Sequence, residues 1–99
     1  MILSQSDLMN ATFKVDTNET LTPFEDYQVT LIEIQRLLNW EWQYEEYVAG
    51  FLTEDELPTQ TWKRVMAGNY KLRDIWARSK DTRDPEFVRF IEDNILSEN

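Results

Sequence analysis

The sequence predicts a mainly α-helical fold, a single small bundle of four to five helices formed by residues 1–99 as one domain. Three observations predict this fold. Apolar residues recur at spacings of three and four, which is the period of one face of an α-helix. Capping-box and proline-first patterns mark several helix starts. The chain has 99 residues with 41% hydrophobic and 13% aromatic content and no cysteine, so helix packing rather than disulfides must stabilise it.

Residues 1–22 form an irregular N-terminal segment in this prediction. Ser6 fits the cap of a short helix that ends at Ala11, and Phe13 and Val15 alternate with polar neighbours as in a strand. One short strand or hairpin near residues 12–22 is therefore an open alternative. The apolar start is too short for a signal peptide, and no later run is long enough to span a membrane. We expect a cytoplasmic protein without a membrane partner.

Residues 23–49 are expected to form one long helix or a broken one. Thr22 can cap it, Pro23 fits its first position, Glu25 completes a capping box, and Gly50 ends it. Two apolar stripes follow helical spacing on opposite sides. The first stripe consists of Phe24, Tyr27, Leu31, Ile34, Leu38 and Trp42. The second stripe consists of Leu37, Trp40, Tyr44, Tyr47 or Val48, and Phe51. Either the helix breaks near Asn39, or its C-terminal half is apolar on two sides.

Short helices are expected over residues 53–79 and a C-terminal helix over residues 85–96. Thr53 begins a capping box that Pro58 stops within one turn, and Thr59 caps a helix that ends at Gly68. A helix over residues 70–79 follows. Its buried residues are expected to be Leu72, Ile75 and Trp76. The last helix begins at the Asp84-Pro85 pair. Its apolar side contains Phe87, Val88, Phe90, Ile91 and Ile95.

The formal charge of −9 is unevenly divided along the chain. Residues 1–62 hold two basic and twelve acidic side chains, a net of −10. Residues 63–83 hold seven basic and two acidic side chains, a net of +5, and residues 84–99 contribute −4. The basic segment therefore either faces acidic segments within the fold or offers a surface to an anionic partner. Exposed ion pairs contribute only about 0–1 kcal/mol each, so pairing alone does not explain the division.

Several classes of chemistry lack the residues they need. Histidine and cysteine are absent and there are two glycines, which excludes a catalytic triad, a thiolate zinc site and a glycine-rich phosphate loop. The acidic pairs lie at expected helix starts, where the helix macrodipole already explains them. We expect no enzyme, no catalytic residues, no metal and no cofactor.

Residues 39–51 favour a protein-interaction function. This segment interleaves five aromatic residues with three carboxylates. Tyrosine and tryptophan supply the hot spots of interfaces, and carboxylates steer a chain toward a basic partner surface. Two opposed stripes are too many for one small core, so we expect the second stripe to be at least partly exposed; burial of both remains the open alternative. The predicted partner-binding residues are Trp40, Glu41, Tyr44, Glu45, Tyr47 and Phe51.

The expected role is that of a regulator, inhibitor or assembly factor that binds a protein with a basic surface. Small helical proteins of this kind, many of them encoded by phages, have a similar composition. The acidic body and basic segment are complementary, so self-association is also expected to be possible.

Nucleic-acid binding through residues 59–83 is the alternative function. Residues 57–68 resemble the second helix of a helix-turn-helix, with polar residues 59–61 at the N-terminus, where base contacts are made. The candidate contacts to nucleic acid or another anionic partner are Gln60, Lys63, Arg64, Lys71, Arg73 and Arg78. The acidic residues 54–56 and the net charge oppose this reading, because phosphate neutralisation supplies most non-specific affinity.

Overall fold

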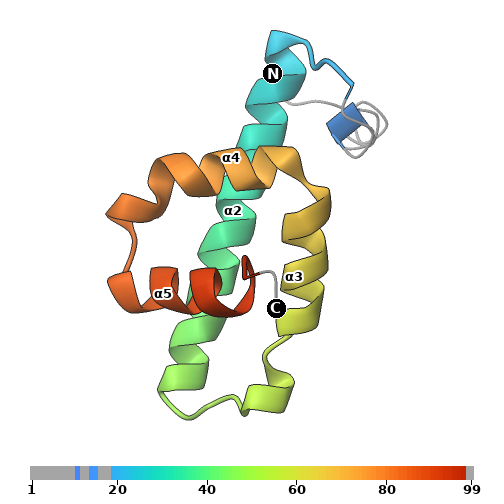
Figure 1. The fold of residues 1–99 in the computed structure, drawn as a ribbon. Coiled ribbons are helices and arrows are strands. Elements are labelled where there is room, and N and C mark those ends of the chain that lie inside the picture. Colours follow the sequence, from blue (N-terminus) through green and yellow to red (C-terminus); the bar gives the residue numbers. More distant parts are fainter. Residues whose placement is uncertain (1–10, 12–13, 16–18, 98–99) are drawn as a thin grey trace.

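A computed structural model describes residues 11, 14–15 and 19–97 of the chain. The elements in order are α2 (Pro23–Val48), the 3₁₀ turn η1 (Glu54–Glu56), α3 (Thr59–Gly68), α4 (Tyr70–Ser79), the 3₁₀ turn η2 (Lys80–Thr82) and α5 (Pro85–Asn94) (Figure 1). The described residues contain no strand, which confirms the all-α fold. Of the segment expected as a strand or hairpin, residues 12–13 and 16–18 lie outside the described residues, and residues 14–15 are helical.

Helix α2 runs without interruption for 26 residues and does not break near Asn39. It begins with the expected capping box. The backbone N–H of Glu25 donates to Thr22 Oγ1 at 3.1 Å, and the N–H of Thr22 donates to Glu25 Oε1 at 2.9 Å. After its end, Gly50 adopts a φ of +91°, a left-handed conformation that other residues rarely adopt. Local patterns therefore predicted the start of α2 correctly and its end to within one residue.

The later helices begin where the sequence indicates, with one exception. Asn69 and Asp84 cap α4 and α5 through side-chain oxygens that accept from the N–H groups of Leu72 and Glu86. The prediction that Thr59 caps α3 is wrong, because Pro58 occupies the cap position. The Pro58 carbonyl accepts the first helical bond from the Trp62 N–H at 3.0 Å, which places Thr59 already inside the helix.

The end of α5 also differs from the prediction, which extended the helix to residue 96. The helix ends at Asn94, where the N–H groups of Ile95 and Leu96 both donate to the carbonyl of Ile91 at 2.9 Å. The bond from Leu96 spans five residues instead of the four of an α-helix, so the regular pattern of backbone hydrogen bonds stops here.

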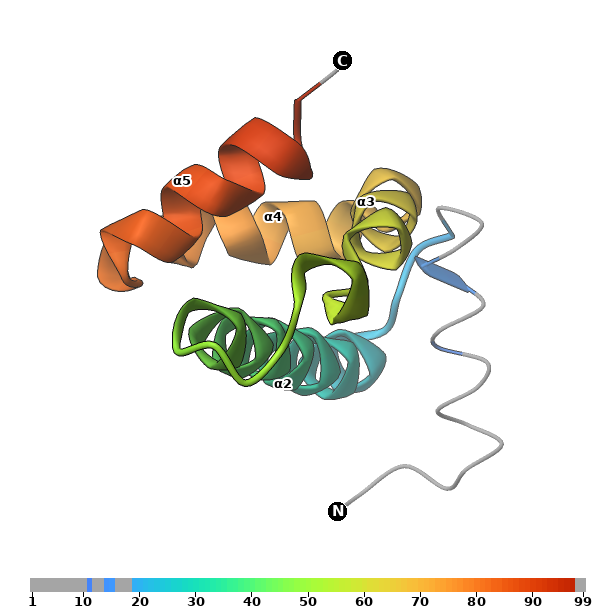
Figure 2. The ribbon, with the colours of Figure 1, turned by 90° about the horizontal axis from the view of Figure 1, so that it is seen from below.

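Helices α3, α4 and α5 all lie on the same side of α2. Figure 1 shows α4 and α5 crossing α2 while α3 runs beside it, and Figure 2 shows all three on one side of it. The main core lies between them. Its buried residues are Leu37, Trp40, Tyr44, Leu57, Trp62, Met66, Leu72, Ile75, Trp76, Phe87, Ile91 and Ile95. The three residues expected to be buried in α4 are among them, as predicted.

Aromatic contacts connect α2 with α3 and α5. Trp40 stacks on Trp62 with ring centroids 4.9 Å apart and an interplanar angle of 13°. The Tyr44 ring lies 5.5 Å from Phe87, which meets Trp76 edge to face at 5.8 Å. Such pairs contribute about 0.5–1.5 kcal/mol each beyond the area they bury. The face of α2 that carries Trp40 and Tyr44 is therefore the core face.

The two capping boxes make the stability of the fold depend on pH under acidic conditions. Hydrogen bonds from the backbone of Thr22 and Thr53 lower the pKa values of Glu25 and Glu56 below the ordinary value of 4.5, and Lys14 lowers that of Glu25 further. A lowered pKa in the folded state stabilises the fold above pH 4.5, and the contribution is lost as pH falls through the lower value. We expect Glu25→Gln and Glu56→Gln to flatten the fall of the thermal midpoint below pH 4.5.

The measurement is the melting temperature by circular dichroism between neutral pH and acid, for each variant and the parent. Glu54→Gln is the matched control, because the side chain of Glu54 is exposed and makes no described hydrogen bond or ion pair. If the melting temperature falls with the same slope below pH 4.5 in all three variants and in the parent, the two capping boxes are not the source of the pH dependence.

Candidate functional site

The second stripe of α2 is exposed only at its C-terminal end, whereas the first stripe is exposed along its length. In the second stripe, Trp40 and Tyr44 are 6% and 8% exposed, so the prediction that these two side chains reach the surface is wrong. In the first stripe, Trp42 is 61% exposed. All six residues of the first stripe are exposed, at 37–61%. The physical reason is that α3, α4 and α5 pack on one side of α2 and leave the opposite side without a described neighbour (Figure 2).

A buried carboxylate lies on the core face of α2 among apolar residues. Glu33 lies in line with Val29, Leu37 and Trp40 and is 3% exposed. The side-chain amide of Asn69 donates to Glu33 Oε1 at 3.2 Å, and Arg36 Nε lies 3.1 Å from Glu33 Oε2. Buried charges persist only where such partners satisfy them. The core stripe therefore contains a charged residue, whereas the exposed first stripe is uniformly apolar.

Of the predicted partner-binding residues, Glu45 and Phe51 are exposed. Phe51 is 75% exposed, and the carboxylate of Glu45 makes no described ion pair. Tyr47 is half-buried against Tyr44. Glu41 faces the fold, with Arg83 3.9 Å from Oε2 and the N–H of Asp84 donating to Oε1 at 3.5 Å. Its carboxylate is therefore engaged inside the molecule.

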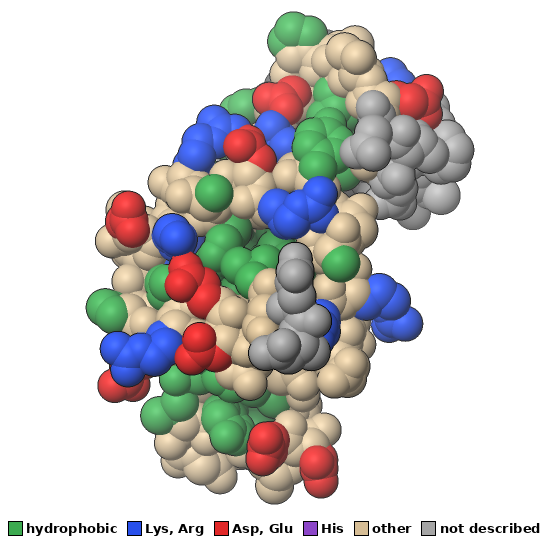
Figure 3. Space-filling model, in the orientation of Figure 1, with side chains coloured by type: hydrophobic (Ala, Val, Ile, Leu, Met, Phe, Trp, Pro, Cys, Tyr) green, Lys and Arg blue, Asp and Glu red, His purple; other side chains and the backbone are tan. Residues whose placement is uncertain are grey.

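The end of the molecule where α2 stops carries exposed apolar and acidic side chains together. We call this surface the acidic-aromatic end and define it by Trp42, Glu45, Glu46, Val48 and Phe51. Val48 is 59% exposed, and among the described residues neither Glu45 nor Glu46 has an ion-pair partner. The carboxylates of η1 follow closely in the chain. Figure 3 shows hydrophobic and acidic side chains at this end.

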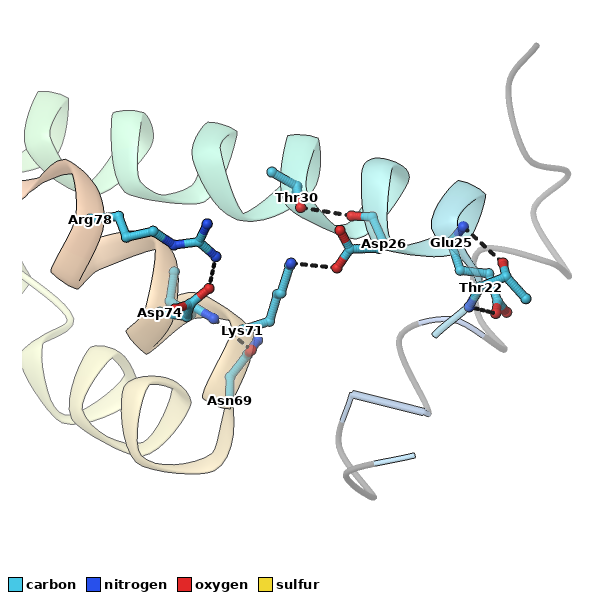
Figure 4. Close-up of polar contacts among 9 residues, drawn as sticks. Thr22, Glu25, Asp26, Thr30, Asn69, Lys71, Asp74 and Arg78 are labelled. Carbon is cyan, nitrogen blue, oxygen red and sulfur yellow. Dashed lines mark hydrogen bonds and ion pairs between the residues drawn. The ribbon is translucent and has the colours of Figure 1, made fainter. Parts of the chain in front are cut away.

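The basic segment is largely engaged within the fold. Lys71 is 7% exposed and pairs with Asp26 of α2, as Figure 4 shows. Lys80 Nζ lies 3.0 Å from Glu92 Oε1, and the guanidinium of Arg83 lies 6.0 Å from the Trp76 ring centroid in addition to its contact with Glu41. These contacts join the basic segment to both acidic segments. The uneven charge along the sequence is therefore partly neutralised in space.

The predicted nucleic-acid contacts do not gather into one basic patch. Arg73 donates to the carbonyls of Met66 and Ala67 at 2.8 and 2.6 Å and so caps the end of α3. Arg78 pairs with Asp74 one turn earlier in α4, and Lys71 is buried (Figure 4). The remaining candidates lie on α3. Gln60 and Arg64 are exposed and Lys63 is half-buried. This placement does not favour the nucleic-acid reading.

Tyr44 places a phenol in the interior. Burial, and then the carboxylates of Glu86 and Asp84, raise the pKa of the Tyr44 phenol above 10.0, so this buried hydroxyl stays protonated near neutral pH. Within the described ranges, no three acidic side chains are grouped to hold a metal ion. In the same part of the chain, no helix combines the length and apolar content needed to cross a membrane.

The fold and surface define a small all-α protein with one apolar helix face and an acidic-aromatic end. The chain matches no protein-family model, no curated protein and no solved structure.

Proposed function

We propose that the protein is a non-enzymatic interaction module that binds a partner protein with a basic surface, as a regulator, inhibitor or assembly factor does. The observation that carries the proposal is the acidic-aromatic end. Its large apolar side chains are 59–75% exposed beside carboxylates that no described cation neutralises. An exposed apolar patch with polar residues around it is typical of a protein–protein interaction site.

The two kinds of side chain have separate roles in this proposal. Phe51 and Trp42 supply the buried contact area, because aromatic residues at the centre of an interface carry most of its binding energy. Glu45 and Glu46 raise the association rate with a basic partner and reject acidic ones. The carboxylate of Glu41 is held by Arg83 and is assigned no steering role.

The test is capture of a partner from native extract treated with nuclease, followed by affinity measurements with the captured protein. We expect Phe51→Ala to weaken binding about tenfold or more, since truncation of a hot spot costs about 2 kcal/mol. Replacement of Glu45 and Glu46 by glutamine is expected to slow association and reduce its dependence on salt.

Arg64→Glu is the matched control, because Arg64 is exposed on α3 away from the acidic-aromatic end. Binding that survives nuclease and Arg64→Glu but not Phe51→Ala supports the proposal. Binding that is lost after nuclease or with Arg64→Glu, and is unchanged by Phe51→Ala, contradicts it and favours the basic segment.

A further inference from the structure

Between positions 24 and 39, the first stripe of α2 lies on a helix face without charge. The residues of this face between positions 24 and 39 are Phe24, Tyr27, Gln28, Leu31, Ile34, Gln35, Leu38 and Asn39. The charged residues of the same part of α2 point to other sides, where Glu25 contacts Lys14 and Asp26 contacts Lys71. In a chain with 29% charged residues, four helical turns without charge on an exposed face are typical of a contact surface.

A shallow groove of about 620 Å³ runs beside this face. Its lining comes from α2 and includes the apolar Leu31 and Ile32, the neutral amides of Gln28, Gln35 and Asn39, and Arg36, whose guanidinium is paired with the buried Glu33. Neutral amides at the edge of an apolar stripe can hydrogen bond to a neighbour but do not attract a charged one. The surface therefore fits a partner that is itself apolar and uncharged, and does not fit the basic partner proposed for the acidic-aromatic end.

We propose that a second copy of this chain covers the first stripe, with the two α2 helices packed antiparallel about a two-fold axis. The stripe follows spacings of three and four, as in helices that pack side by side. Antiparallel pairing centred near residue 33 places Phe24 opposite Trp42 of the second copy. The same register places Tyr27 opposite Leu38 and Leu31 opposite Ile34. Every member of the stripe then meets another member, as a self-complementary two-fold interface requires.

Charge favours the antiparallel orientation over the parallel one. Glu45 and Glu46 lie in the last turn of α2. A parallel pair would bring these carboxylates of both copies together. An antiparallel pair places them beside the N-terminus of the other α2, where the helix macrodipole is positive. The acidic side chains of that first turn, Glu25 and Asp26, are already paired with lysines.

Self-association through this interface goes beyond the proposed function. Its affinity should change with salt in the opposite direction to the affinity for a basic partner. Each copy carries a net charge of −9, so screening by salt strengthens association between copies. Binding of a basic partner at the acidic-aromatic end weakens under the same change. The two surfaces share Trp42 and otherwise use different residues.

The first part of the test is sedimentation equilibrium of the full chain from about 1 μM to about 1 mM. We expect a monomer–dimer equilibrium that tightens between about 0.05 and 0.5 M salt. Leu31→Glu and, separately, Leu38→Glu should weaken dimerisation about a hundredfold or more, because each buries two unpaired carboxylates per dimer. Leu31 and Leu38 are 46% and 49% exposed, so helical circular dichroism should persist. Ala77→Glu, on an exposed position of α4, adds the same charge and should leave the dimer intact.

The second part tests orientation and uses the absence of native cysteine. In the antiparallel pair, Tyr27→Cys mixed with Leu38→Cys should form a disulfide between copies, and neither variant should do so alone. Residue 27 of one copy and residue 27 of the other are then about 16 Å apart along the helix axis. A disulfide needs Cα atoms within about 7 Å, so Tyr27→Cys alone should form none.

A strictly monomeric parent chain, or a dimer that Leu31→Glu and Leu38→Glu leave unchanged, would overturn the interface. Disulfides formed by each cysteine variant alone would overturn the antiparallel orientation. Loss of the dimer in Leu31→Glu with partner capture retained would separate this surface from the acidic-aromatic end.

Discussion

Replacing Trp40 with alanine is expected to lower the free energy of unfolding by about 3–5 kcal/mol. Trp40 is 6% exposed and stacks on Trp62, which is itself 2% exposed. Removal of the indole leaves a cavity between α2 and α3 and deprives Trp62 of its stacking partner. A domain of this size is stable by about 5–15 kcal/mol, so the variant retains only a part of its stability.

Trp42 provides the matched control on the same helix. It is the same residue type, two positions further along, and 61% exposed. Trp42→Ala is expected to cost less than about 1 kcal/mol. Urea unfolding followed by circular dichroism, at a concentration low enough to avoid association, measures both variants. Equal losses, or a greater loss for Trp42→Ala, would show that the face of α2 assigned to the core is the wrong one.

The second large effect is expected from Asn69→Ala, with a loss of about 2–4 kcal/mol. Asn69 is 8% exposed and serves two elements at once. Its side-chain oxygen accepts from the Leu72 N–H and caps α4, while its amide group donates to the buried carboxylate of Glu33. The substitution removes a helix cap and takes a hydrogen bond from a buried charge.

Two controls separate these contributions. Asn69→Ser keeps an oxygen that can cap α4 but provides no amide donor for Glu33. It should therefore lower the free energy of unfolding, but by less than Asn69→Ala does. Asn39→Ala changes an exposed asparagine on α2 and should be neutral or slightly stabilising, because alanine favours helix. If Asn69→Ala is no more costly than Asn39→Ala, the buried connection between α2 and α4 does not stabilise the fold.

Helix positions could be predicted from the sequence because the interactions that start and stop helices are local. The capping boxes at Thr22 and Thr53 use partners three residues away, and Gly50 adopts its left-handed conformation without any distant contact. The same rule explains the error at Thr59. A capping residue type stands there, but the preceding proline takes the cap position.

The orientation of α2 could not be predicted in the same way. Both stripes have helical spacing, and the choice depends on which side α3, α4 and α5 occupy. The core face also contains Glu33, whose partner Asn69 is 36 residues away in the chain. Without that contact the core stripe looks interrupted, whereas the charge-free first stripe looks like a core.

The exposure of the predicted binding residues was therefore predicted in part. Phe51 and Glu45 are exposed, as expected, and Phe51 lies just beyond the helix stop at Gly50. Trp40 and Tyr44 were assigned to the surface, and the neighbouring Trp42 was not among the predicted binding residues. The absence of charge around the first stripe was visible in the sequence. An interface and a core have the same composition, so this signal could not separate them.

Helix α2 turns Trp40 into the core, and in our proposal it presents the first stripe outward as an interaction surface. Hydroxyl-radical footprinting of the native chain, read residue by residue by mass spectrometry, tests both assignments. In dilute protein we expect oxidation of Trp42, Tyr27 and Phe51 and protection of Trp40 and Trp62. In concentrated protein, Trp42 and Tyr27 should become protected while Phe51 stays reactive. Oxidation of Trp40 as rapid as that of Trp42 in dilute native protein would contradict the burial of Trp40 in the core.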